Sequence, residues 1–73
     1  MKPGESSLTW EDSYTIARAL AIAYPDVDLE EVSLLDIYHW TMALPDFVDE
    51  PELANDAILT AIFQEWFEEV TLI

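Results

Sequence analysis

The stretch ILTAIFQEWFEE, residues 58–69, decides the fold class of this chain. Its large apolar residues recur every three or four positions, a spacing that places them on one wide face of a helix. Upstream, Pro51 suits the first position of a helix, where its missing N–H costs nothing. The pattern therefore predicts a helix from Pro51 to about Glu69. Its apolar face is made by Ile58, Leu59, Ile62, Phe63, Trp66 and Phe67.

Two more helices are predicted before this one. The first runs from about Trp10 to Tyr24, where apolar residues recur every four positions, and Pro25 ends it. Thr9 and Asp12 fit a capping box, in which each side chain accepts a hydrogen bond from a free backbone N–H near the helix start. These signals are local, so they predict the start of the helix without any knowledge of the rest of the fold.

The other helix is predicted from about Leu34 to Leu44. Ser33 and Asp36 have the spacing of a second capping box, and Pro45 stops the helix. With three helices divided by prolines, the sequence predicts an all-α fold with at most a minor β element, arranged as a compact three-helix bundle. We expect residues 1–8 to be a flexible leader and residues 9–73 to form a single domain.

Charge is the most unusual property of the sequence. The chain has sixteen acidic residues and two basic ones, Lys2 and Arg18, and its net charge is -14. At least fourteen carboxylates therefore have no cationic side chain to pair with, and their repulsion favours the binding of cations or basic proteins. The same balance argues against direct binding of DNA, RNA or anionic membranes, because no basic patch exists to contact phosphates.

Several classes of site and location are excluded or disfavoured by composition. The chain has no cysteine, which rules out disulfides, thiolate zinc sites and cysteine-ligated iron–sulfur clusters. The start MKPGESS lacks the apolar stretch of a signal peptide, and no run approaches the roughly 20 apolar residues of a membrane span. We therefore expect a cytoplasmic protein. The single histidine, His39, has no catalytic companions in the sequence, so no enzymatic activity is expected.

Acidic residues gather in three clusters. The connector after Pro25 alternates like a calcium loop, but an EF-hand needs glycine at its sixth position, where Glu31 stands. A looser cation site and a solvated connector both remain open. The cluster around Pro51 is either a set of helix-start anions or a docking ridge, and the third cluster lies where the helix dipole disfavours anions. The clusters are Asp26, Asp28, Glu30 and Glu31; Asp46, Asp49, Glu50 and Glu52; and Glu65, Glu68 and Glu69.

Aromatic residues supply most of the bulky side chains, with three each of Trp, Tyr and Phe. In so small a chain most of them are expected in the core. One or two are expected at the surface, as anchors of an interface, where Trp and Tyr are enriched.

Four segments in order resemble the IscX family, small acidic proteins of bacterial iron–sulfur cluster assembly. They are LTWEDS (8–13), AYPDVD (23–28), LPDFVDEP (44–51) and AI-x-x-x-W-x-E-E (61–69), with the pair Asp36 and Trp40 between the second and third. One departure concerns the histidine, which the family tends to place one position earlier, where Tyr38 stands here.

The resemblance implies a modified winged-helix arrangement of three helices. It also implies an adaptor or regulator that binds the cysteine desulfurase IscS, and possible further contacts with the scaffold protein and ferredoxin. The family is thought to bind iron weakly through surface carboxylates, without ligating an iron–sulfur cluster. On this reading Asp26, Asp28, Glu30 and Glu31 hold iron. A basic patch on the desulfurase is contacted by Asp46, Asp49, Glu50, Glu65, Glu68 and Glu69.

Two hypotheses of other classes stay open at this point. An acidic protein can mimic nucleic acid and inhibit a basic DNA-binding protein, which requires charges spaced along one face like phosphates. It can also be a plain buffer of divalent cations, which predicts that calcium or magnesium stabilises it as much as iron does.

Overall fold

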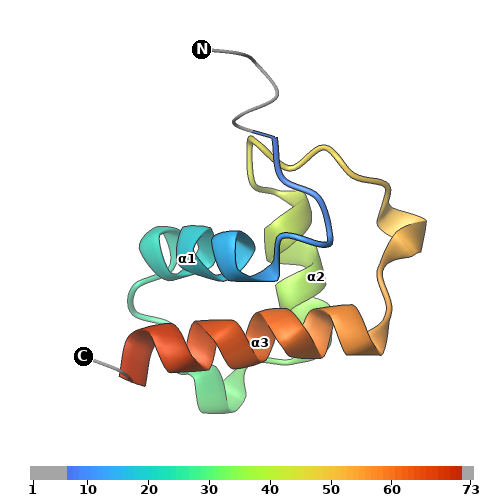
Figure 1. Cartoon of the computed structure of the whole chain (residues 1–73). Coiled ribbons are helices and arrows are strands. Elements are labelled where there is room, and N and C mark those ends of the chain that lie inside the picture. Colours follow the sequence, from blue (N-terminus) through green and yellow to red (C-terminus); the bar gives the residue numbers. More distant parts are fainter. Residues whose placement is uncertain (1–6, 72–73) are drawn as a thin grey trace.

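The computed structural model describes residues 7–71 and has three α-helices and two short 3₁₀-helices (Figure 1). This confirms the predicted all-α, three-helix class. Within the described range no strand is formed, and the β structure is limited to one isolated parallel bridge between Leu8 and Phe47. The winged-helix relationship stays a prediction. In chain order the elements are α1 (Ser13–Ala23), η2 (Leu29–Glu31), α2 (Leu34–Met42), η3 (Pro51–Leu53) and α3 (Asp56–Thr71).

The core lies between α1 and α3, which share the most extensive helix contact, with α2 running crosswise to both (Figure 1). Apolar residues four apart in the sequence supply it, because that spacing repeats one face of a helix. Ile16 and Leu20 of α1 are fully buried, as are Ile62 and Trp66 of α3. Ile37 of α2 completes this centre.

Helix α1 begins at Ser13, three residues after the predicted start at Trp10. The predicted capping box is half formed: the Asp12 carboxylate accepts from the Thr9 N–H at 2.9 Å, but the Asp12 N–H donates to the Thr9 carbonyl instead of the Thr9 hydroxyl. The segment is therefore a turn that precedes the helix. Trp10 lies in this turn because its ring packs against Phe47 and both of its N–H groups donate hydrogen bonds to residues 49 and 50.

Helix α2 confirms the Ser33–Asp36 capping box, with both reciprocal hydrogen bonds at 3.1 Å. It ends at Met42, two residues before the predicted Leu44. The proline at 45 disfavours helical geometry at the residue before it. The chain accordingly leaves the helix through a tight turn in which the Leu44 N–H donates to the Thr41 carbonyl.

The prediction that the third helix starts at Pro51 is wrong. Pro51 opens the short η3, and extended backbone at Ala54 separates it from α3, which starts at Asp56. The side chain of Asn55 accepts from the Ile58 N–H at 2.9 Å and thereby satisfies a free donor of the first turn. At the other end α3 continues to Thr71, two residues past the predicted Glu69.

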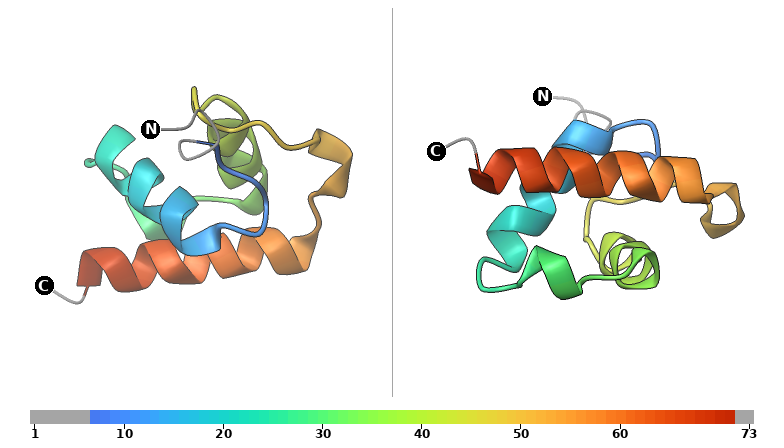
Figure 2. Two further views of the ribbon diagram at one scale, coloured as in Figure 1. Left: turned by 45° about the horizontal axis from the view of Figure 1, so that its top comes forward. Right: turned by 90° about the horizontal axis from the view of Figure 1, so that it is seen from below.

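The segment before α1 is held against the loop that follows α2, as the left view of Figure 2 shows. Leu8 exchanges two backbone hydrogen bonds with this loop, donating to the Asp46 carbonyl at 2.9 Å and accepting from the Val48 N–H at 3.0 Å. The predicted flexible leader lies mainly in residues 1–6, outside the described residues. Leu8, its last residue, is part of the folded body.

One buried polar group in the core has no hydrogen-bond partner among the described residues. Thr41 of α2 is fully buried, and its Oγ1 has no hydrogen-bond partner among residues 7–71. Burying an unpaired hydroxyl costs about 1–3 kcal/mol. We expect Thr41→Val, which keeps the shape and removes the hydroxyl, to raise the free energy of unfolding by about 1 kcal/mol in urea denaturation. Thr41→Ser keeps the hydroxyl and loses a methyl group, so it should destabilise. A lower free energy of unfolding for Thr41→Val would mean that the Thr41 hydroxyl makes a hydrogen bond in the folded protein.

Candidate functional site

The acidic side chains lie at the surface. Of the fifteen described, ten are exposed, five are half-buried and none is buried. The one described lysine or arginine is Arg18, whose Nε lies 3.9 Å from a carboxylate oxygen of Glu69 in a partly solvated pair. An exposed pair of this kind offsets little of the repulsion. The exposed ten are Glu11, Asp26, Asp28, Glu30, Glu31, Asp46, Glu50, Glu52, Asp56 and Glu68.

The six residues predicted to bind a partner do not form one patch. Asp46, Asp49 and Glu50 lie on the loop held beside the start of α1. The other three lie in the last turns of α3, on the other side of the molecule in Figure 1. These three residues of α3 are Glu65, Glu68 and Glu69. A partner that touches one group does not need to touch the other.

Asp49 has an internal role that the sequence did not indicate. It is half-buried, and its two carboxylate oxygens accept from the Trp10 N–H at 3.1 Å and the Glu50 N–H at 2.8 Å. The indole N–H of Trp10 donates to the Glu50 carbonyl at 2.7 Å. Asp49 therefore ties the loop to the segment before α1, which leaves less of its carboxylate for a partner.

The four predicted iron ligands all lie on the connector between α1 and α2, and all are exposed. Asp28 caps η2 by accepting from the Glu30 N–H at 3.0 Å. Across residues 7–71, no three histidine or acidic side chains are grouped so that they could hold a metal ion. The connector thus carries dense negative charge without a preformed site of three or more such side chains among the described residues.

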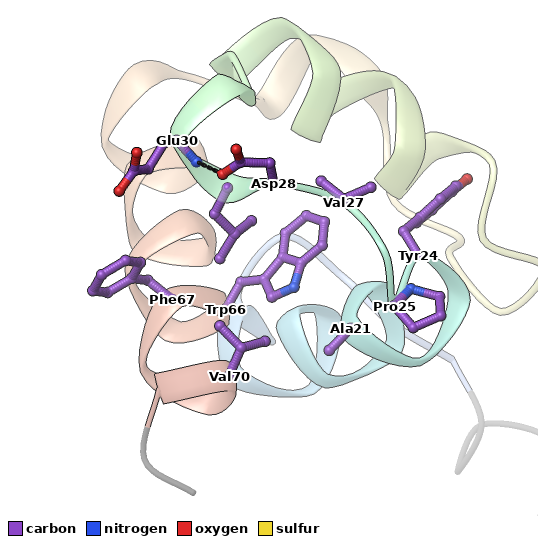
Figure 3. Close-up of a pocket in the computed structure, with 10 residues that line it drawn as sticks. Ala21, Tyr24, Pro25, Val27, Asp28, Glu30, Trp66, Phe67 and Val70 are labelled. Atoms are coloured by element: carbon purple, nitrogen blue, oxygen red, sulfur yellow. Dashed lines mark hydrogen bonds between the residues drawn. The ribbon is translucent and has the colours of Figure 1, made fainter.

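A pocket joins this connector to the end of α3 (Figure 3). Its volume is about 250 Å³, and the Trp66 ring points into it with Val27 on one side and Val70 on the other. Asp28 and Glu30 supply its polar wall. The remaining lining residues are apolar: Ala21, Tyr24, Pro25, Leu29 and Phe67.

Phe67 departs from its predicted place in the core. Its side chain is 46% exposed beside the pocket, and that of Val70 is 43% exposed. One or two exposed aromatic residues were predicted, and Phe67 and Tyr14 are exposed. Their role as interface anchors stays a prediction. The pocket itself was missed. Its walls come from residues 21–30 and 66–70, and no signal in a single sequence pairs those segments.

A second hollow of about 360 Å³ lies between α2 and the segment that leads into α3. Leu35, Pro51 and Leu59 line it, with Asp56 as its single acidic residue. One of its lining residues is acidic, compared with two in the first pocket.

Comparisons with known proteins agree with the resemblance seen in the sequence. The family model for iron–sulphur cluster assembly matches residues 8–71. An uncharacterized protein of Pseudomonas aeruginosa is 38% identical over 63 residues, which is 86% of this chain and 96% of that protein. In the described part of the chain, no helix has the length and apolar character needed to cross a membrane. The match spans the whole described fold, and the chain belongs to the iron–sulphur cluster assembly family.

Proposed function

We propose that this protein is a non-enzymatic adaptor or regulator of iron–sulfur cluster assembly that binds the cysteine desulfurase through its acidic surface. The observation that carries the proposal is the set of ten exposed carboxylates on a body with one described basic side chain, Arg18. Such a surface attracts a basic patch on a partner and discourages anionic ones. Family membership supplies the pathway, and the charge supplies the means of recognition.

Weak iron binding belongs to the same proposal. Iron ions of hard character accept carboxylate oxygens, and the connector residues Asp26, Asp28, Glu30 and Glu31 offer the densest group of them. One or two carboxylates with water completing the shell would give low affinity. That suits a protein that responds to iron supply rather than one that stores the metal. We further propose that it works in the cytoplasm.

Calorimetric titration with the cysteine desulfurase tests the proposal. Exposed charges attract each other over a distance that shrinks as salt rises, so affinity should fall about tenfold or more between about 50 mM and about 300 mM salt. Equal affinity at both salt concentrations would remove the electrostatic mechanism. Absence of binding at low salt would remove the adaptor function itself.

The same samples separate the two competing hypotheses. A nucleic-acid mimic should bind a DNA-binding protein in competition with DNA and ignore the desulfurase. A general cation buffer should gain as much thermal stability from calcium or magnesium as from iron. The division of the acidic residues between two sides of the molecule favours neither a phosphate-like row nor a single cation cage.

A further inference from the structure

The pocket beside the connector combines two properties that the proposed function does not require. Most of its lining residues are hydrophobic, and two large apolar side chains stand open at its edge. These are Phe67 and Val70. It is also acidic on one wall, through Asp28 and Glu30. A purely electrostatic adaptor needs charge and no pocket, so the apolar part calls for its own explanation.

We propose that this pocket receives one apolar side chain, of leucine or phenylalanine size, carried on a lysine- or arginine-rich segment of the protein partner. This inference rests on the proposed function and specifies how the partner is held. The size fits, because an apolar cavity of about 150 Å³ already takes up benzene, and this pocket measures about 250 Å³.

Charge around the pocket identifies the occupant as basic. Asp28 is held in place by its hydrogen bond to the Glu30 N–H, so a carboxylate stays fixed at the wall (Figure 3). Asp26 lies between two lining residues, Pro25 and Val27, and is exposed. No lysine or arginine lines the pocket within the described residues. An apolar side chain with a cation beside it would therefore meet hydrophobic lining residues and an acidic wall.

The same charge argues against the other occupants. A second copy of this chain brings a net charge of -14 to a surface that is already negative, so self-association through this face is opposed by repulsion. An anionic metabolite or lipid headgroup meets the same repulsion. A neutral apolar compound fits the hydrophobic lining of the pocket but gains nothing from its acidic wall.

A peptide titration followed by NMR on the full chain tests the inference without the desulfurase. The first probe is a five-residue amide with a central phenylalanine between two pairs of lysines. The second has alanine at the centre, and the third has glutamates in place of the lysines. We expect the first to shift the signals of Ala21, Val27 and Val70 most strongly. The second should cause small shifts spread over acidic residues, and the third none. Equal responses to the first two probes, equal responses to the first and third, or shifts centred on Leu35 and Leu59 would overturn the proposal.

Variants then connect the pocket to the desulfurase. Phe67→Ala should lower affinity for the desulfurase and for the first peptide by about tenfold or more, as expected for an anchor contact. Tyr14→Ala removes a comparably exposed aromatic ring outside the pocket and should leave both affinities unchanged. Val70→Ala provides a second pocket variant if Phe67→Ala folds poorly.

The outcomes distinguish this inference from the proposed function. If the wild-type chain binds the desulfurase and Phe67→Ala binds it equally well, the pocket contact is wrong while the adaptor function stands. If the wild-type chain fails to bind the desulfurase but the phenylalanine peptide enters the pocket, the proposed function is wrong. The pocket would then still be a site for a basic segment of a different protein.

Discussion

Trp10→Ala is expected to remove about half of the free energy of unfolding. The Trp10 side chain is 3% exposed, and its ring packs edge-on against Phe47 at 4.5 Å and stacks on Tyr38 at 6.0 Å between ring centroids. Truncating a buried tryptophan to alanine costs about 3–5 kcal/mol. A chain of 73 residues has a total stability of about 4–11 kcal/mol at typical values per residue, so about half of it would be lost at mid-range values.

The loss of the indole hydrogen bond raises the cost further, while the backbone N–H at position 10 is retained in Trp10→Ala. The backbone and indole N–H groups of Trp10 donate to Asp49 and to the Glu50 carbonyl, across 39 and 40 residues of sequence. Losing the ring frees the Glu50 carbonyl and loosens the loop that the segment before α1 holds. Trp10→Phe keeps a ring but loses the indole donor, so we expect an intermediate loss of about 1–3 kcal/mol.

Thermal and urea unfolding followed by circular dichroism measure these effects. The control is Tyr14→Ala, whose side chain is 51% exposed on α1 and whose free energy of unfolding should change by no more than about 0.5 kcal/mol. A Trp10→Ala protein that melts cooperatively within a few degrees of the wild type would show that the turn before α1 is not part of the core.

Trp10 also illustrates what the sequence could predict about the fold. The helix count, the Ser33–Asp36 cap and the all-α class depend on periodicity, proline positions and contacts between near neighbours, and these were correct. The start of α1 was wrong because bonds to residues 49 and 50 hold Trp10 in a turn. Periodicity favoured a longer helix, and tertiary contacts outweighed it.

The candidate functional site could also be predicted only in part from the sequence. The acidic clusters were visible in the sequence, since charge at the surface needs no knowledge of packing. Their grouping in space was not, because it depends on how α3 lies against the connector between α1 and α2. That packing put Glu50 and Glu68 in separate groups and placed Phe67 beside Glu30 at one pocket. The sequence predicts Asp49 as a docking residue, but its hydrogen bonds to two backbone N–H groups depend on the fold and leave no signal in the sequence.

Neutralising three connector carboxylates is expected to weaken desulfurase binding far more than neutralising three on the opposite loop. The connector variant carries Asp26→Asn, Glu30→Gln and Glu31→Gln. All three side chains are exposed, and the connector forms the acidic wall of the pocket. Exposed charge pairs contribute about 0.2–1 kcal/mol each, so losing three should cost about 0.6–3 kcal/mol and reduce affinity by about threefold to 150-fold. Asp28 stays unchanged because it caps η2.

The loop variant carries Asp46→Asn, Glu50→Gln and Glu52→Gln, and it is matched in the number of charges removed. Its residues are also exposed, while Asp49 is kept because it binds the Trp10 N–H. Both variants lose three negative charges, so long-range attraction to a basic partner falls equally and any difference between them reports location. We expect only a few-fold loss for the loop variant in calorimetry at low salt. An equal or larger loss there would move the docking surface to the loop and detach it from the pocket.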